Sequence, residues 1–266
     1  MSQTKNMEVQ TGQMPRSLIW AMLVLCVAPF MLNLVGVDFS SSKPGFPWAE
    51  VSTMAPHERI DAMFHTLSGS FTHTLLEWTA FLTAIFTLLL AFLHFTISRD
   101  VTTPIIGVAL FCAGVMDAFH TLAADRLIES VADNRNLIPF TWAISRIFNA
   151  LILIVGVGLF MHKRVKTLKG DLRFVLGISA GFLVLAYTII SYCANSAQLP
   201  QTMYPDSLIT RPYDVAPLIL FAVAGLTLFR WFHKQRPGIF THALLLSMVP
   251  EVVVELHMAF GSTALF

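Results

Sequence analysis

Seven long apolar stretches constrain this chain more than any other feature of its sequence. Each contains close to the ~20 residues that an α-helix needs to cross ~30 Å of hydrocarbon. Of the 266 residues, 55% are hydrophobic and only 12% are charged, whereas an average soluble domain has roughly 25% charged residues. The sequence therefore predicts an all-α, polytopic membrane bundle. The predicted spans are 17–37, 73–97, 103–124, 139–161, 173–193, 213–232 and 239–260.

The first span follows a short N-terminal tail, residues 1–16. Its apolar run is longer than the core of an ordinary signal peptide, and no small-x-small cleavage site follows it cleanly. We therefore expect a retained anchor rather than a cleaved signal. Residues 17–266 are then predicted to form one membrane-embedded domain.

The charges of the connecting loops predict the orientation. Three loops are basic, with Arg99 in one, Lys163, Arg164, Lys166, Lys169 and Arg173 in another, and Arg230, Lys234 and Arg236 in the third. The remaining loops are mixed or acidic, and the last of them carries Asp206, Arg211 and Asp214. The positive-inside rule places the basic loops and the N-terminus in the cytoplasm. The net charge is +1, and no basic tract suggests a nucleic-acid partner.

The longest outer loop, residues 38–72, ends in an amphipathic segment. Apolar residues recur there at helical spacing: Ile60, Met63, Phe64, Leu67 and Phe71. This pattern predicts a short helix that lies flat at the outer interface as a brace, with a lid over a site as the alternative.

Most ionisable residues within the spans gather toward the predicted outer face. His73 and Glu77 are spaced i,i+4 on the second span, and Asp117 and His120 are spaced i,i+3 on the third. Each pair therefore shares one face of its helix. The short connection between the two spans predicts that these helices are antiparallel neighbours.

The fourth and seventh spans add polar residues at a similar depth. Arg146 lies on the fourth, and Glu251 and Glu255 are spaced i,i+4 on the seventh, with His257 just beyond. Ionisable groups in hydrocarbon are costly and commonly mark a functional site. The predicted ligand-binding residues are His73, Glu77, Asp117, His120, Arg146, Glu251 and Glu255.

Imidazole nitrogens beside carboxylate oxygens suit a transition-metal ion such as zinc, copper or iron. The predicted metal ligands are His73, Glu77, Asp117, His120 and His257. Two alternatives stay open. Arg146 could pair with Glu77 or Asp117 in a structural or proton-titrating network. A pair of histidines could instead ligate haem, the less favoured cofactor, or bind a quinone.

Four short pieces carry a family resemblance: HTLLEW at 73–78, DAFHTL at 117–122, NLIP at 136–139 and WAISR at 142–146. In this order they resemble the third type of bacterial membrane-associated sensor (MASE) domain, from His73 to about Leu159, and more loosely through the last two spans. The resemblance implies an N-terminal sensory module of a histidine kinase or diguanylate cyclase in the bacterial inner membrane. No kinase or cyclase sequence lies within these residues. We therefore expect a chain truncated before a last span and a cytoplasmic output domain.

The sequence thus predicts a sensory input domain that recognises a small molecule or a metal ion. Its expected partners are the lipid bilayer and the output module of the parent chain, and a homodimer is left open. No catalytic residue is assigned. The alternatives are a transporter or an ion- or proton-conducting protein, and a membrane haem or metal redox protein. A transporter would favour polar residues through the whole membrane depth, yet the inner half is nearly free of charge.

Overall fold

The computed structural model describes residues 13–37, 49–161 and 170–260. Its helices are α1 (Arg16–Leu34), α2 (Pro56–Ser98), α3 (Thr102–Ala124), α4 (Asn134–Gly158), α5 (Leu172–Asn195), α6 (Val215–Ala224), α7 (Arg230–Gln235), α8 (Ile239–Leu246) and α9 (Met248–Phe260). Turns of 3₁₀-helix cover Leu159–Met161 and Pro212–Asp214, and the π-helical turn Gly225–Phe229 joins α6 to α7. The described part of the chain contains no strand, which confirms the all-α prediction.

Among the described residues, six helical stretches are long and apolar enough to cross a membrane: Pro56–Ser98, Thr102–Ala124, Asn134–Met161, Leu172–Asn195, Pro212–Gln235 and Ile239–Phe260. The last five coincide with predicted spans to within a few residues. The first predicted span corresponds to α1, whose apolar stretch Arg16–Leu32 is shorter. The chain is therefore a multi-pass helical bundle. Its orientation stays a prediction, and we call the end with the α3–α4 connection the outer end.

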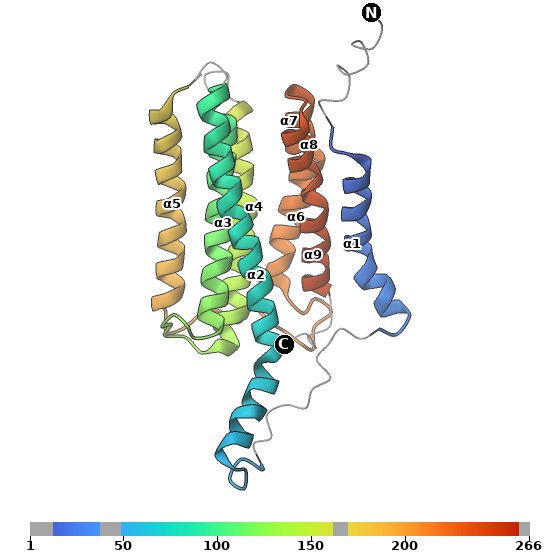
Figure 1. Ribbon diagram of the computed structural model, residues 1–266, viewed down its shortest axis with the longest axis vertical. Coiled ribbons are helices and arrows are strands. Elements are labelled where there is room, and N and C mark those ends of the chain that lie inside the picture. Colours follow the sequence, from blue (N-terminus) through green and yellow to red (C-terminus); the bar gives the residue numbers. More distant parts are fainter. Residues whose placement is uncertain (1–12, 38–48, 162–169, 261–266) are drawn as a thin grey trace, which may run out of the picture.

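The second span differs most from its prediction. α2 runs without a break over 43 residues, or roughly 64 Å at ~1.5 Å per residue. The separate flat helix expected at residues 60–71 is therefore wrong, because these residues continue the spanning helix past the end of the bundle (Figure 1). The sequence between them and the span contains no proline that would end a helix. The sequence changes near residue 72 from amphipathic to fully apolar, and this change predicted the end of one helix and the start of another. The backbone instead continues as one helix through this point.

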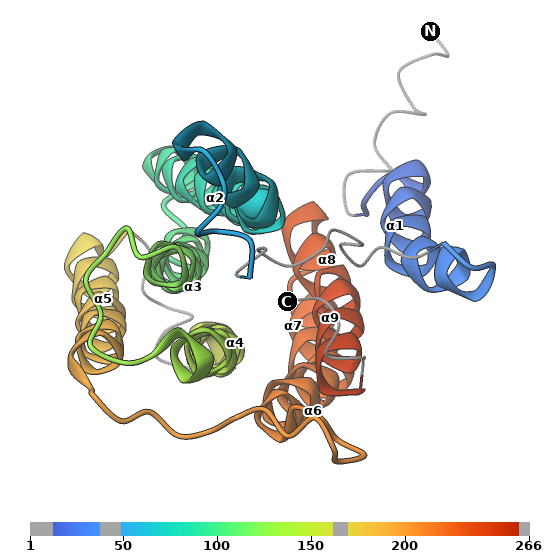
Figure 2. The ribbon, with the colours of Figure 1, turned by 90° about the horizontal axis from the view of Figure 1, so that it is seen from below.

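Two glycines bring α2 and α3 close together. A Cβ atom added at Gly107 would lie 2.6 Å from the Cβ of Ala91, and one added at Gly114 would lie 3.0 Å from that of Ala84. α3 also packs against α4 and α5, so that it lies inside this group of helices (Figure 2). Its side chains are accordingly the most buried of the six spans.

The second group of helices consists of α6 to α9. α6 packs against both α4 and α9, while α1 lies at the periphery and touches α9 (Figure 2). At the inner end, Arg236 donates to Thr102 Oγ1 at 2.5 Å and so ties this group to the α2–α3 connection. At the outer end, the α4–α6–α9 contact brings charged residues of α4 and α9 face to face.

Candidate ligand site

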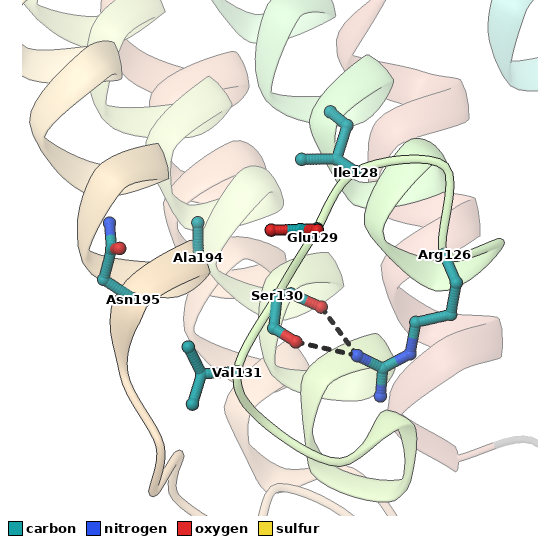
Figure 3. A pocket seen from close by; sticks show the side chains of 7 residues that line it. All are labelled: Arg126, Ile128, Glu129, Ser130, Val131, Ala194 and Asn195. Atoms are coloured by element: carbon teal, nitrogen blue, oxygen red, sulfur yellow. Dashed lines mark hydrogen bonds between the residues drawn. The ribbon is translucent and has the colours of Figure 1, made fainter.

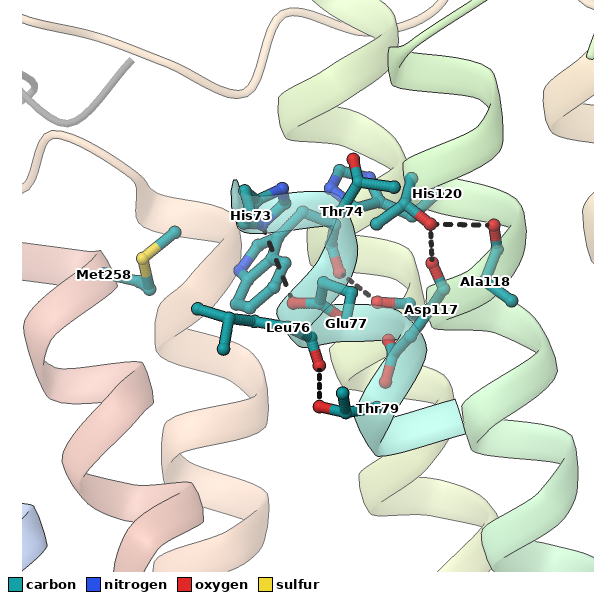
Figure 4. Close-up of polar contacts among 12 residues, drawn as sticks. His73, Thr74, Leu76, Glu77, Thr79, Asp117, Ala118, His120 and Met258 are labelled. Carbon is teal, nitrogen blue, oxygen red and sulfur yellow. Dashed lines mark hydrogen bonds and ion pairs between the residues drawn. The ribbon is translucent and has the colours of Figure 1, made fainter. Parts of the chain in front are cut away.

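Four predicted site residues meet between α2 and α3. His73 Nε2 lies 3.6 Å from Glu77 Oε1, and the imidazole rings of His73 and His120 are 6.1 Å apart at right angles (Figure 4). Asp117 follows one turn deeper and interacts electrostatically with Glu77. The structure therefore places both pairs on facing sides of neighbouring helices.

His120 is only 2% exposed, and its hydrogen bonding fixes which nitrogen carries the proton. Its Nδ1 lies 2.7 Å from Thr141 Oγ1 on α4, and this hydroxyl also lies 2.7 Å from the Leu137 carbonyl oxygen. A carbonyl can only accept, so the hydroxyl donates to it and accepts from Nδ1–H. His120 Nε2 is therefore left as an acceptor when the ring is neutral.

Arg146 connects α4 to α9. Its Nε donates to Glu255 Oε1 at 2.7 Å, and its Nη2 pairs with Glu251. Asn149 Nδ2 also donates to Glu251, at 3.3 Å. The alternative that Arg146 pairs directly with Glu77 or Asp117 is wrong for the described residues, because its ion pairs go to α9, although both carboxyls lie within its electrostatic reach. Its guanidinium also lies 5.4 Å from the centre of the Trp142 ring.

A second buried ion pair extends this layer and was not among the predicted site residues. Arg211 Nε lies 2.7 Å from Asp214 Oδ2, and the Asp214 side chain is fully buried. Burial lowers the pKa of Arg211, whereas the charges of Asp214 and Glu255 oppose this shift. Both residues had been counted as parts of an outer loop. Their i,i+3 spacing at the start of a span was the signal that could have found them.

The same region contains buried polar atoms that no described residue satisfies. They are Trp142 Nε1, Asn149 Oδ1, Asp214 Oδ1 and Glu255 Oε2. Leaving one such atom without a partner costs about 1–3 kcal/mol, and native proteins usually satisfy these groups with protein, water or ligand atoms. Three are acceptors and one is a donor. The layer therefore has unused hydrogen-bonding capacity.

His257 does not join the other predicted metal ligands. It follows Glu255 by two residues and is therefore turned by about 200° around the helix. Its ring packs edge-on against Phe30 of α1, with the ring centres 5.7 Å apart. Within the ranges that the structure describes, no three His, Cys, Asp or Glu side chains are grouped so as to hold a metal ion. The geometry thus gives no support to the predicted metal ion, and the metal ion and haem both stay predictions.

An open hollow of about 560 Å³ lies elsewhere on the outer end, between the α3–α4 connection and the end of α5 (Figure 3). Arg126 at its edge donates to the carbonyl and hydroxyl oxygens of Ser130, both at 2.9 Å, and to the Ala132 carbonyl. These bonds show that Arg126 holds the connection in shape. None of the predicted ligand-binding residues lines this hollow.

A multi-pass helical bundle with a buried layer of acids, imidazoles and guanidinium groups near one end is an integral membrane protein built around a polar site. The sequence matches the model of the MASE3 family, described as a membrane-associated sensor domain, over residues 66–264. The match covers well over half of the chain, and the chain belongs to this family. It confirms the resemblance seen in the sequence and continues through the last two spans. No curated protein and no solved structure matches the chain.

Proposed function

We propose that this membrane sensor domain recognises a small molecule in the polar layer at its outer end. The observation that supports this most is the set of unsatisfied buried atoms around Arg146. They come from α4, from the turn before α6 and from α9. A ligand in contact with these atoms would meet elements from both helix groups at once.

The charge of the layer favours a ligand that donates hydrogen bonds. Its carboxyl groups are Glu77, Asp117, Asp214, Glu251 and Glu255, and its guanidinium groups are Arg146 and Arg211. Carboxyls therefore outnumber guanidiniums, and acceptors predominate among the unsatisfied atoms. A ligand with amine, amide or hydroxyl donors would supply what the layer lacks. A small molecule is proposed before a metal ion because the described side chains form no metal-holding group.

Binding would act on the relative position of the two helix groups. A ligand shifts such an equilibrium only by the difference between its affinities for the two arrangements. A ligand that contacts both α4 and α9 would bind more tightly to the arrangement in which both helices reach it, and this gives the required difference in affinity. In line with the sequence resemblance, we propose that the domain lies in the bacterial inner membrane and is joined to a histidine kinase or diguanylate cyclase output module.

The test uses the full-length protein that carries this domain. Replacing His73, Asp117 and His120 together by Gln, Asn and Gln removes the imidazoles and one acid of the layer at little change in size. We expect the output to stop responding to the conditions that change it in the wild type, with the same amount of protein in the membrane. The matched control is Glu129→Gln, an exposed acid of the hollow at the same end. An unchanged response of the triple variant would contradict the proposal.

Elemental analysis of the purified protein decides between the two kinds of ligand. We expect no stoichiometric transition metal in the wild type. If the wild type contained a bound metal that the triple variant lacked, the ligand of the layer would be a metal ion and not a small molecule.

A further inference from the structure

Both long stretches of the second helix group are interrupted in their middle part. α6 continues into α7 through the π-helical turn Gly225–Phe229, and α8 continues into α9 through Ser247. A π-helical turn holds more residues than an α-helical turn, because its hydrogen bonds join residues i and i+5. Pro250 has no N–H for the carbonyl of Leu246, so the second stretch lacks one helical hydrogen bond there. Prolines and π-helical turns are the usual places at which long helices bend.

The two interruptions lie against each other. A Cβ atom added at Gly225 would lie 3.1 Å from the Cβ atom and 3.3 Å from the Cγ atom of Met248. The π-helical turn also packs against α8. Both interruptions therefore occupy one level of the bundle, with α7 and α8 on one side and α6 and α9 on the other (Figure 1). At this level, neither stretch is supported by an unbroken helix of its own group.

Side-chain hydroxyl groups bond to backbone carbonyls at both interruptions. Thr227 Oγ1 donates to the Val223 carbonyl oxygen at 2.6 Å, and Ser247 Oγ donates to the Leu244 carbonyl oxygen at 2.9 Å. Hydrogen bonds of this kind slightly weaken a helix and often bend it. Both stretches are therefore more easily bent at this level than elsewhere.

The parts on the two sides of this level are each held together, and we call α7 with α8 the inner unit and α6 with α9 the outer unit. Thr241 Oγ1 of α8 donates to the Arg236 carbonyl oxygen at 2.6 Å, so it accepts from His233 Nδ1 of α7 at 3.0 Å. On the outer side, α6 packs along α9, and Arg146 pairs with Glu251 in the first turn of α9. Each unit can therefore move as one body.

We propose that a hinge, formed by Gly225–Phe229 and Ser247–Pro250, joins the two units and lets the inner unit swing against the outer one. Hinges are short segments that take up a change in backbone angles. Glu251 directly follows the hinge, so a shift of this residue in the polar layer acts on it. At the inner end, the swing moves Arg236 relative to Thr102. The hinge itself needs no ligand, whereas its use to carry a signal inward rests on the proposed function.

Distances between spin labels in a lipid nanodisc test the hinge. Pairs of cysteines replace exposed residues: Lys234 and Arg173 at the inner end, and Tyr213 and Arg135 at the outer end. The background chain has Cys26→Ser, since Cys112 and Cys193 are buried. Because the swing displaces only the inner unit, we expect the distance distribution of the inner pair to be about twice as broad as that of the outer pair. Equal widths would overturn the hinge.

Restoring unbroken helices is expected to remove this difference. Deleting Leu226, which is 73% exposed and leaves no cavity, takes one residue from the π-helical turn and lets it close as an α-helical turn. Together with Pro250→Ala, which supplies the missing N–H, the deletion is expected to narrow the inner distribution to the width of the outer one. Pro217→Ala is the matched control, because Pro217 lies in the first turn of α6, where an N–H has no helical partner. It is expected to leave both distributions unchanged.

Pro250→Ala alone keeps the hinge testable if the deletion prevents folding, and it is expected to narrow the inner distribution by part of the same amount. An inner distribution that stays as broad in these variants as in the wild type would overturn the hinge. Failure of the proposed function shows separately, as an unchanged response of the variant in which His73, Asp117 and His120 are replaced. That result would leave the measured distances, and with them the hinge, as they are.

Discussion

At the scale of residues, Arg146 holds together charges that would otherwise face hydrocarbon alone. It is 9% exposed and pairs with two carboxylates from another helix. An ion pair in such a place adds little net stability over apolar packing, but removing one partner leaves the other charged and unpaired. The residue is therefore expected to matter for the integrity of the site as well as for recognition.

Arg146→Ala is expected to lower the free energy of unfolding by about 3–5 kcal/mol, the usual cost of leaving a buried charge without its partner. Exposed Arg135 on the same helix is the matched control, and Arg135→Ala is expected to change stability by less than ~0.5 kcal/mol. Equilibrium unfolding in detergent micelles measures both. Similar effects of the two substitutions would show that Arg146 is not a buried connection.

Thr141→Val tests the tautomer assigned to His120. The variant removes the acceptor of Nδ1–H and leaves a buried donor unpaired, at a cost of about 1–3 kcal/mol. Thr188→Val is the control, because Thr188 also donates to a carbonyl one turn earlier but is exposed on α5. Nitrogen NMR of the wild type should show the proton of neutral His120 on Nδ1. A proton on Nε2 would refute the assignment.

At the scale of elements, the close approach of α2 and α3 sets the distance between the two histidines. Gly107 allows this approach, whereas Gly177 on α5 has open space around it. The two glycines therefore predict opposite effects of the same substitution.

Gly107→Ala is expected to destabilise the bundle by about 1–3 kcal/mol, because the new methyl group overlaps Ala91. Gly177→Ala is expected to be stabilising by up to ~1 kcal/mol, because alanine favours helix more than glycine does. Thermal or denaturant unfolding of both variants measures whether each substitution raises or lowers the stability. Two stabilising substitutions would show that α2 and α3 do not meet as described.

The sequence predicted most elements well because the length of an apolar run directly reports a span. It failed at α2, since amphipathic spacing shows which side of a helix is apolar but not whether the helix lies flat or projects. It also placed Glu251 and Glu255 on one face of α9 without showing that Arg146 would be their partner. Arg211 and Asp214 were missed because they were counted as loop residues. Their i,i+3 spacing indicated that they could pair, but their burial depends on neighbouring helices.

At the scale of the whole molecule, the polar layer lies where the two helix groups meet, with α4 and α6 at the junction. Ligand binding in the polar layer could therefore move one helix group relative to the other. At the outer end, the hydrogen bond from Ser70 to Asp125 joins α2 to the end of α3. At the inner end, the hydrogen bond from Arg236 to Thr102 joins the end of α7 to the start of α3.

A density map of the wild-type chain in a lipid nanodisc, at a resolution that shows water, tests the central proposal most directly. The account predicts density for a bound molecule or ordered waters in contact with Glu255 Oε2 and Asp214 Oδ1, between α4 and α9. It would be contradicted by a dry, closed layer in which those oxygens touch only apolar atoms, or by side chains turned outward into lipid.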